Sequence, residues 1–279
     1  MSSPLDPELS AANAPVQAPD QAPNLAETSR PEYSEWDPRS APGTYLLLAI
    51  NIAVFLWMTI HGVSLRDPTP DQLVHYGANN PALVLEGQWY RLLTATFVHI
   101  GIIHIATNMW CLWNLGLLGE PLLGPYGMVA VYVLTGVAGN LVSVAWDVIM
   151  IPHEYLAQQV GAGASGAVFG IAGILIVLLS NRRLPIPWSE LKRLRTSVVR
   201  FAGINLIIGL STLWGPLGNF VRIDNSAHLG GFLSGLALGP GLVPRMTSGR
   251  VRYLARQRII FIAAAFLLSL FGYWIANAG

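Results

Sequence analysis

A serine and a histidine, each at the head of an apolar stretch, are the residues whose types could support nucleophilic catalysis. Ser165 stands in Gly163-Ala164-Ser165-Gly166, and His228 stands in Ala227-His228-Leu229-Gly230-Gly231. A serine hydroxyl is a weak nucleophile until an adjacent base takes its proton, and histidine can be that base. Taken alone, the serine segment is more typical of a flexible turn whose hydroxyl bonds back to a helix carbonyl. The G-x-S-x-G elbow of soluble hydrolases is absent, because Ala167 replaces its last glycine.

Glycines follow both residues at helical spacing. At 100° per residue, Gly231 and Gly235 lie within about 60° of His228 on one helix face. Gly166 stands directly after Ser165. Small residues let membrane helices approach closely, and a serine and a histidine on separate helices need such an approach to act together. The alternative is a helix-packing face that carries an incidental histidine.

A third polar group consists of His99, His104 and Asn108. His104 and Asn108 are four residues apart, so they share one helix face and can donate hydrogen bonds into a bundle. A metal site is the competing interpretation. His99 and His104 are about 140° apart around a helix, and no carboxylate or thiolate accompanies them at ligand spacing. The sequence therefore favours hydrogen bonding, and we expect neither a metal nor another cofactor.

The elements that must position these residues are predicted to be membrane helices. Hydrophobic residues make up 53% of the 279 and charged residues only 11%, so lipid is the expected solvent for most of the chain. The net charge of +1 gives no indication of a nucleic-acid partner, and one cysteine, Cys111, excludes an internal disulfide. We therefore expect an all-α polytopic membrane protein. The apolar runs predict seven helices, at 44–60, 100–118, 127–146, 165–180, 201–214, 227–243 and 259–276.

The regions outside the helices predict the domain organisation and the orientation. Residues 1–43 are rich in proline and acidic residues, which predicts a disordered tail. Residues 44–243 form the expected catalytic membrane domain, and 244–279 a basic joint with one further helix. Lys and Arg concentrate in the joints at 182–200 and 245–258, whereas the opposite loops hold only Arg66, Arg91 and Arg222. The positive-inside rule then predicts a multi-pass protein of the cell membrane, with a cytoplasmic N-terminus and an outside C-terminus.

The sequence resembles the rhomboid family of intramembrane proteases over about residues 44–243. Gly163 to Gly166 matches the family's G-x-S-G, which implies that Ser165 is the nucleophile. Ala227-His228 with Gly231 and Gly235 matches A-H-x-x-G-x-x-x-G, which implies that His228 is the base of a dyad without an aspartate. The resemblance implies a six-helix bundle, here followed by a seventh transmembrane helix, and substrates that are transmembrane proteins of the lipid bilayer.

The remaining motifs assign supporting roles by the same resemblance. The spacing of His99, His104 and Asn108 matches H-x-x-x-x-H-x-x-x-N, which implies that His104 and Asn108 donate to the oxyanion beside the Ser165 N–H, and that His99 is structural. Trp89-Tyr90-Arg91 matches the outer loop, with Arg91 as its anchor. The sequence departs from the family at Tyr90, where tryptophan is frequent, and at Phe169, where tyrosine is common. Phe169 can still stack on the His228 ring, because only the hydroxyl is missing.

Two other functions remain open at this stage. The first is a catalytically inactive rhomboid-like protein that binds membrane clients. The second is a small-solute transporter that uses His99 and His104. The presence of Ser165, His228, His104 and Asn108 weighs against the inactive protein. The charged residues that an ion path would use are absent from the seven apolar runs, which weighs against the transporter.

Overall fold

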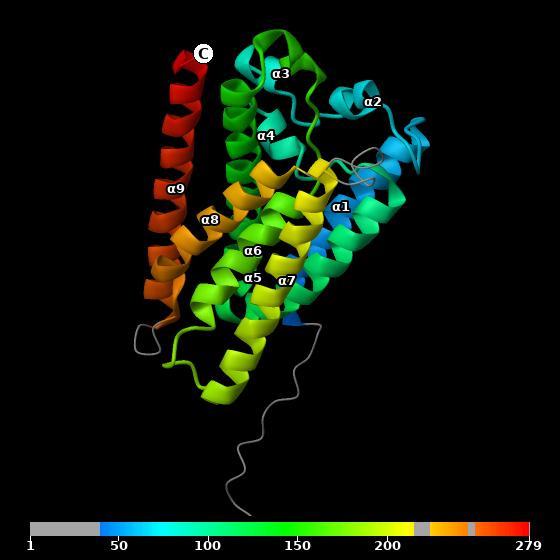
Figure 1. The fold of residues 1–279 in the computed structure, drawn as a ribbon. Coiled ribbons are helices and arrows are strands. Elements are labelled where there is room, and N and C mark those ends of the chain that lie inside the picture. Colours follow the sequence, from blue (N-terminus) through cyan, green and yellow to red (C-terminus); the bar gives the residue numbers. More distant parts are fainter. Residues whose placement is uncertain (1–39, 215–223, 245–248, 279) are drawn as a thin grey trace, which may run out of the picture. The chain divides into compact units, whose positions relative to one another are not determined.

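The computed structural model describes residues 40–214, 224–244 and 249–278, and these residues form helices and no strand (Figure 1). Each of the seven predicted apolar runs lies on a helix, so the predicted all-α class is confirmed. Of the predicted tail, residues 1–39 lie outside the described residues, as do Arg222 and Arg245. The long helices are α1 (Pro42–Ile60), α5 (Gly101–Met150), α6 (Ser165–Leu178), α7 (Trp188–Trp214), α8 (Asn225–Leu242) and α9 (Arg250–Ala278).

Three of the described helices are long and apolar enough to cross a membrane: α1, α5 and the Arg250–Asn277 part of α9. α5 contains two of the predicted runs in one element, broken at Gly124, whose backbone has φ +75° and ψ 164°. Positive φ suits glycine, and the following Pro125 has no N–H to donate to the preceding turn. The two halves of α5 therefore correspond to the second and third predicted membrane helices.

Polar side chains of α9 complete the hydrogen bonding at this break. The Gln257 amide donates to the Leu123 carbonyl at 2.8 Å. The Tyr253 hydroxyl lies 3.1 Å from the Leu122 carbonyl oxygen and 3.0 Å from that of Leu242, at the end of α8. An unsatisfied carbonyl in hydrocarbon costs several kcal/mol. The seventh helix thus stabilises the ends of two other helices.

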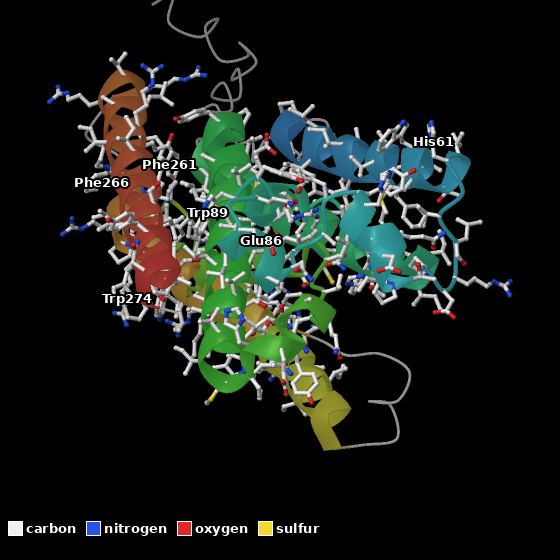
Figure 2. The ribbon with its side chains drawn as sticks, turned by 90° about the horizontal axis from the view of Figure 1, so that it is seen from above. His61, Glu86, Trp89, Phe261, Phe266 and Trp274 are labelled. Carbon is white, nitrogen blue, oxygen red and sulfur yellow. The ribbon has the colours of Figure 1, made fainter. Side chains whose placement is uncertain are left out.

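The C-terminal half of α9 packs on the segment between α1 and α5. A methyl group at Gly272 would lie 3.3 Å from the Trp89 ring. Phe261 is buried against the bundle, whereas Phe266 and Trp274 lie on the outer side of α9 (Figure 2). Ile275 belongs to the same apolar cluster as Val84. The C-terminal end of α9 therefore lies at the same end of the bundle as this segment.

The segment between α1 and α5 contains three short helices: α2 (Pro70–His75), α3 (Pro81–Leu85) and α4 (Arg91–Thr94). Arg91 is only 6% exposed. Its guanidinium donates to the carbonyls of Val74 at 2.6 Å and Ala78 at 3.1 Å, and to the Gln88 side chain at 2.8 Å. Arg91 therefore ties the end of α2 to the start of α4.

Glu120 corrects the expectation that the membrane helices contain no charged residue. It lies on α5, two residues beyond the apolar run, and is 1% exposed. Its carboxylate accepts hydrogen bonds from the N–H groups of Gly43 and Thr44, at 2.8 and 2.6 Å, and from the Thr44 hydroxyl at 2.6 Å. Such groups at a helix start have no intrahelical acceptor. Glu120 therefore caps α1, which is a structural use of the carboxylate.

The short helix α6 lies in the middle of the bundle, in contact with α5, α7 and α8 (Figure 1). Most of its side chains are buried. Its 14 residues extend about 21 Å, which is less than the roughly 30 Å of a hydrocarbon core. A helix of this length cannot reach both membrane surfaces. Its first residue is Ser165.

Candidate active site

Ser165 opens α6 after a turn that only glycine permits. Gly163 has φ +130°, and a methyl group there would lie 2.6 Å from Cε1 of the His104 ring. The Gly163 N–H donates to the Ala95 carbonyl at 2.9 Å, which fixes the turn to the segment before α5. As the first residue of a helix, Ser165 has a backbone N–H without an intrahelical acceptor. The turn brings this N–H and the serine side chain to the end of α6.

His99 contacts the same turn and is fully buried. Its Nε2 accepts a hydrogen bond from the Ala164 N–H at 3.3 Å, and its Nδ1 lies 3.2 Å from the Phe97 carbonyl oxygen. A ring that accepts at Nε2 and donates at Nδ1 is the neutral imidazole with its proton on Nδ1. His99 therefore fixes the residue before Ser165, which is the structural contact that its predicted role requires.

His104 directs its other nitrogen toward the turn. Its Nδ1 accepts from the Ile100 N–H at 3.3 Å, so the neutral ring carries its proton on Nε2. That Nε2 atom would lie 3.0 Å from a methyl group placed on Gly163. Asn108 lies one turn further along α5, is 6% exposed, and donates to the His104 carbonyl at 2.9 Å. This bond uses one of the two N–H groups of the Asn108 amide.

His228 lies on the first turn of α8 and packs face to face with Phe169 of α6. The two ring centroids are 4.4 Å apart and the planes are inclined by only 17°. The His228 side chain is largely buried, with 7% of the residue exposed. The predicted ring contact is therefore present, and it sets the orientation of the imidazole without a hydrogen bond.

Glycine contacts join α6 to α8. A methyl group on Gly231 would collide with the carbonyl oxygen of Gly166, and one on Gly235 would collide with that of Gly170. The two backbones are thus in direct contact over successive turns, immediately after Ser165 on one helix and after His228 on the other. The close approach that the glycine spacing predicts is confirmed.

The hydroxyl and the imidazole are not hydrogen-bonded in this structure. Among the described residues, no hydrogen bond joins Ser165 to His228, and the His228 Nδ1 atom is buried without a partner. A buried polar atom without a partner is costly, so this nitrogen requires an explanation in terms of function or bound water. Catalytic hydrogen bonds are frequently long in unliganded enzymes and shorten when substrate binds.

Asp224 is a site residue that the sequence analysis missed. It is the N-cap of α8, where its carboxylate accepts from the Ala227 N–H at 2.9 Å and from the Ser226 hydroxyl at 2.6 Å. The second carboxylate oxygen accepts from the Ser143 hydroxyl of α5 at 2.6 Å. Aspartate is a preferred N-cap residue, so its place just before the apolar run was the available signal. It fixes the end of α8 that carries His228.

The two candidate metal ligands lie close together but have no third ligand beside them among the described residues. His99 and His104 lie side by side, with ring centroids 5.4 Å apart. In the part of the chain that the structure describes, no three His, Cys, Asp or Glu side chains are grouped closely enough to hold a metal ion. The hydrogen bonds of both histidine rings are instead made to the backbone.

Residues 86–245, more than half of the chain, match the Rhomboid domain family. The chain belongs to the rhomboid family. It is 33% identical over 226 residues to "Rhomboid protease GluP" of Bacillus subtilis (strain 168), which covers 80% of this chain and 39% of that protein. It is 34% identical over 188 residues to "RHOMBOID-like protein 5" of Arabidopsis thaliana, covering 67% of this chain and 55% of that one. With "Rhomboid protease AarA" of Providencia stuartii the identity is 29% over 204 residues and 69% of either chain.

Family membership and the apolar helices together make the chain an integral membrane protein. The matched region begins between α3 and α4 and extends beyond α8, so it includes Ser165, His228, His104 and Asn108. α1 and α9 lie outside it. The chain spans about two fifths of the Bacillus relative and just over half of the first Arabidopsis relative.

Proposed function

We propose that this rhomboid-family protein is an intramembrane serine endopeptidase that cuts peptide bonds in or near transmembrane segments, with Ser165 as nucleophile and His228 as general base. The observation that carries the proposal is the glycine contact between α6 and α8. It leaves no side chain between the two helices at the point where the serine and the histidine stand. The ring of Phe169 then holds the imidazole in place.

The reaction follows from the positions of the groups. The Ser165 hydroxyl attacks the substrate carbonyl while His228 accepts its proton, and His228 later returns that proton to the leaving amine. The negative oxygen that forms needs donors aimed at it in a site of low dielectric. The Ser165 N–H, the Nε2–H of His104 and the second amide N–H of Asn108 are the proposed donors. Water then hydrolyses the acyl-enzyme and regenerates the hydroxyl.

An inactive client-binding protein is the alternative, and a transporter is the third possibility. The complete set of Ser165, His228, His104 and Asn108 favours the enzyme over the inactive protein. Glu120, the one buried carboxylate among the described α5 residues, is engaged by three donors at the start of α1. A group held in this way is poorly suited to carry an ion through a bundle, which weighs against transport.

Labelling with a serine-directed fluorophosphonate separates these functions. The purified protein should be labelled, Ser165→Ala should not, and His228→Ala should react at a strongly reduced rate because the hydroxyl loses its base. Ser180→Ala is the matched control, since Ser180 lies at the other end of α6 and should label like the wild type. Absence of labelling in a folded wild-type protein favours the client-binding function, and undiminished labelling of Ser165→Ala removes Ser165 as nucleophile.

A further inference from the structure

An apolar cavity of about 230 Å³ lies between α6, α7 and α8. Its wall includes Phe169 of α6, Ala202, Gly203 and Leu206 of α7, and His228 of α8. A methyl group added to Gly203 would meet no atom within 4 Å, so the cavity is open at this point. α7 contacts its two neighbours far less extensively than they contact each other, which leaves the space. The cavity thus lies behind the stacked rings of Phe169 and His228.

The surroundings of the cavity are those of a lipid-facing surface. Ile204 and Ile207 of α7 and Leu229 and Leu233 of α8 are all about half exposed or more. These residues flank the cavity on helices of an integral membrane protein, so hydrocarbon is what surrounds its mouth. An apolar cavity does not retain water. Its natural occupant in a bilayer is a hydrocarbon chain.

A cationic groove lies next to the cavity on the same helix. Lys192, Arg193 and Arg200 line it together with the hydroxyl residues Ser189, Thr196 and Ser197. Arg193 forms an ion pair with Glu190 at 3.0 Å. Lys192 and Arg200 have no ion pair among the described residues. They are therefore available for an external anion.

The groove and the cavity follow each other along α7, with their centres about 90° apart around the helix axis. Val199 belongs to the cavity and Arg200, the next residue, to the groove. From Lys192 to Leu206 the helix rises about 21 Å, which compares with one 15 Å leaflet of hydrocarbon plus its headgroup layer. Charge and apolar surface thus follow each other along α7 in the order of a phospholipid.

We propose that α7 binds one anionic phospholipid from the leaflet on the basic side of the bundle. Its phosphate lies between Lys192 and Arg200, and one acyl chain fills the cavity at Gly203 and reaches the rings of Phe169 and His228. A chain in this place supports the ring stack from behind. That consequence for catalysis rests on the proposed protease function, whereas the lipid site itself does not.

The binding test is native mass spectrometry of the full chain in detergent, titrated with dioleoyl phosphatidylglycerol or dioleoyl phosphatidylcholine. The wild type should retain the anionic lipid in preference. Each cation near an anionic lipid contributes about fivefold in affinity, so Lys192→Gln with Arg200→Gln should weaken phosphatidylglycerol binding by about 10- to 30-fold. The matched control is Arg252→Gln with Arg258→Gln, which removes the same charge from α9 and should change binding by less than about threefold.

The acyl chain has its own test. Gly203→Phe places a ring in the open space of the cavity and should weaken phosphatidylglycerol binding, while glycerol phosphate, which lacks chains, should not displace the lipid. Equal lipid retention by the two double variants overturns the site. An unchanged lipid affinity in Gly203→Phe also overturns the site. If KM for a transmembrane substrate rises in the same variant, the cavity binds substrate instead of lipid. Fluorophosphonate labelling is measured separately. A protein that binds lipid but is not labelled refutes the proposed protease function and leaves the lipid site standing.

Discussion

Gly231→Ala tests most sharply whether the glycine contact positions the proposed catalytic pair. Gly231 stands three residues after His228, and the carbonyl oxygen that its methyl group would strike belongs to Gly166, the residue after Ser165. Neither atom of the clash belongs to a flexible side chain. The backbones of α6 and α8 must therefore move apart at the site itself.

The size of the effect follows from the separation that the new methyl group needs. Ordinary contact begins at 3.4 Å, and restoring it displaces one helix from the other by on the order of 1 Å. Overpacking of this kind costs about 1 to 3 kcal/mol of stability. A displacement of 1 Å between reacting groups lowers the rate by about 100-fold. We therefore expect a folded protein of reduced thermal stability whose kcat falls by about two orders of magnitude.

The assay is cleavage of a transmembrane substrate in proteoliposomes, together with thermal unfolding of the same preparations. Gly249→Ala is the matched control, because Gly249 lies directly before α9, away from the site, and its methyl group meets nothing within 4 Å. It should keep its activity and change the stability by less than about 1 kcal/mol. Wild-type activity and stability in Gly231→Ala would refute the close helix contact.

Three further predictions concern the surroundings of the pair. His104→Ala and Asn108→Ala should each lower kcat by about 10- to 1000-fold without effect of chelators, and activity lost to EDTA and restored by zinc would support a metal instead. Phe169→Leu should lower kcat more than it changes KM, because the imidazole loses its stacking partner. Phe169→Tyr keeps an aromatic ring and should have the kcat of the wild type. Equal rates in the wild type and both variants would show that the stack is dispensable. Protease protection should find an N-terminal tag accessible from the cytoplasm and a C-terminal tag from outside, and the reverse pattern would contradict the orientation.

Hydropathy and spacing predict the parts of this fold that apolar residues define. All seven runs lie on helices because a long apolar segment in lipid must satisfy its own backbone hydrogen bonds. The ends of the helices are less well predicted. α7 begins at Trp188 and α9 at Arg250, each well before its apolar run, since a helix continues through a polar segment that hydropathy does not score. Glu120 was missed for the same reason.

The contacts in the candidate site that depend on residues within one helix turn were predictable from the sequence. The glycine spacing after Ser165 and His228 predicted the contact between α6 and α8. The contacts that depend on distant segments were not predictable from spacing. The bond from Ala164 to His99 crosses 65 residues, and the bond from Gln257 to Leu123 crosses 134. No local pattern specifies such partners. The hydrogen bonds from α9 to the break in α5 could therefore be found only from the structure.

We propose that Ser165 lies inside the membrane and cuts a peptide bond that is also embedded there. A helical substrate cannot present that bond, because its carbonyls are bonded to amides four residues on, so the segment must first unwind. The direct measurement is mass spectrometry of the products from a reconstituted transmembrane segment, made with and without a Gly or Pro helix breaker at matched hydrophobicity. We predict cleavage near the outer end of the segment, faster with the breaker, and lower by at least about a thousandfold in Ser165→Ala. Undiminished cleavage by Ser165→Ala, or products cut only well outside the membrane, would contradict the account.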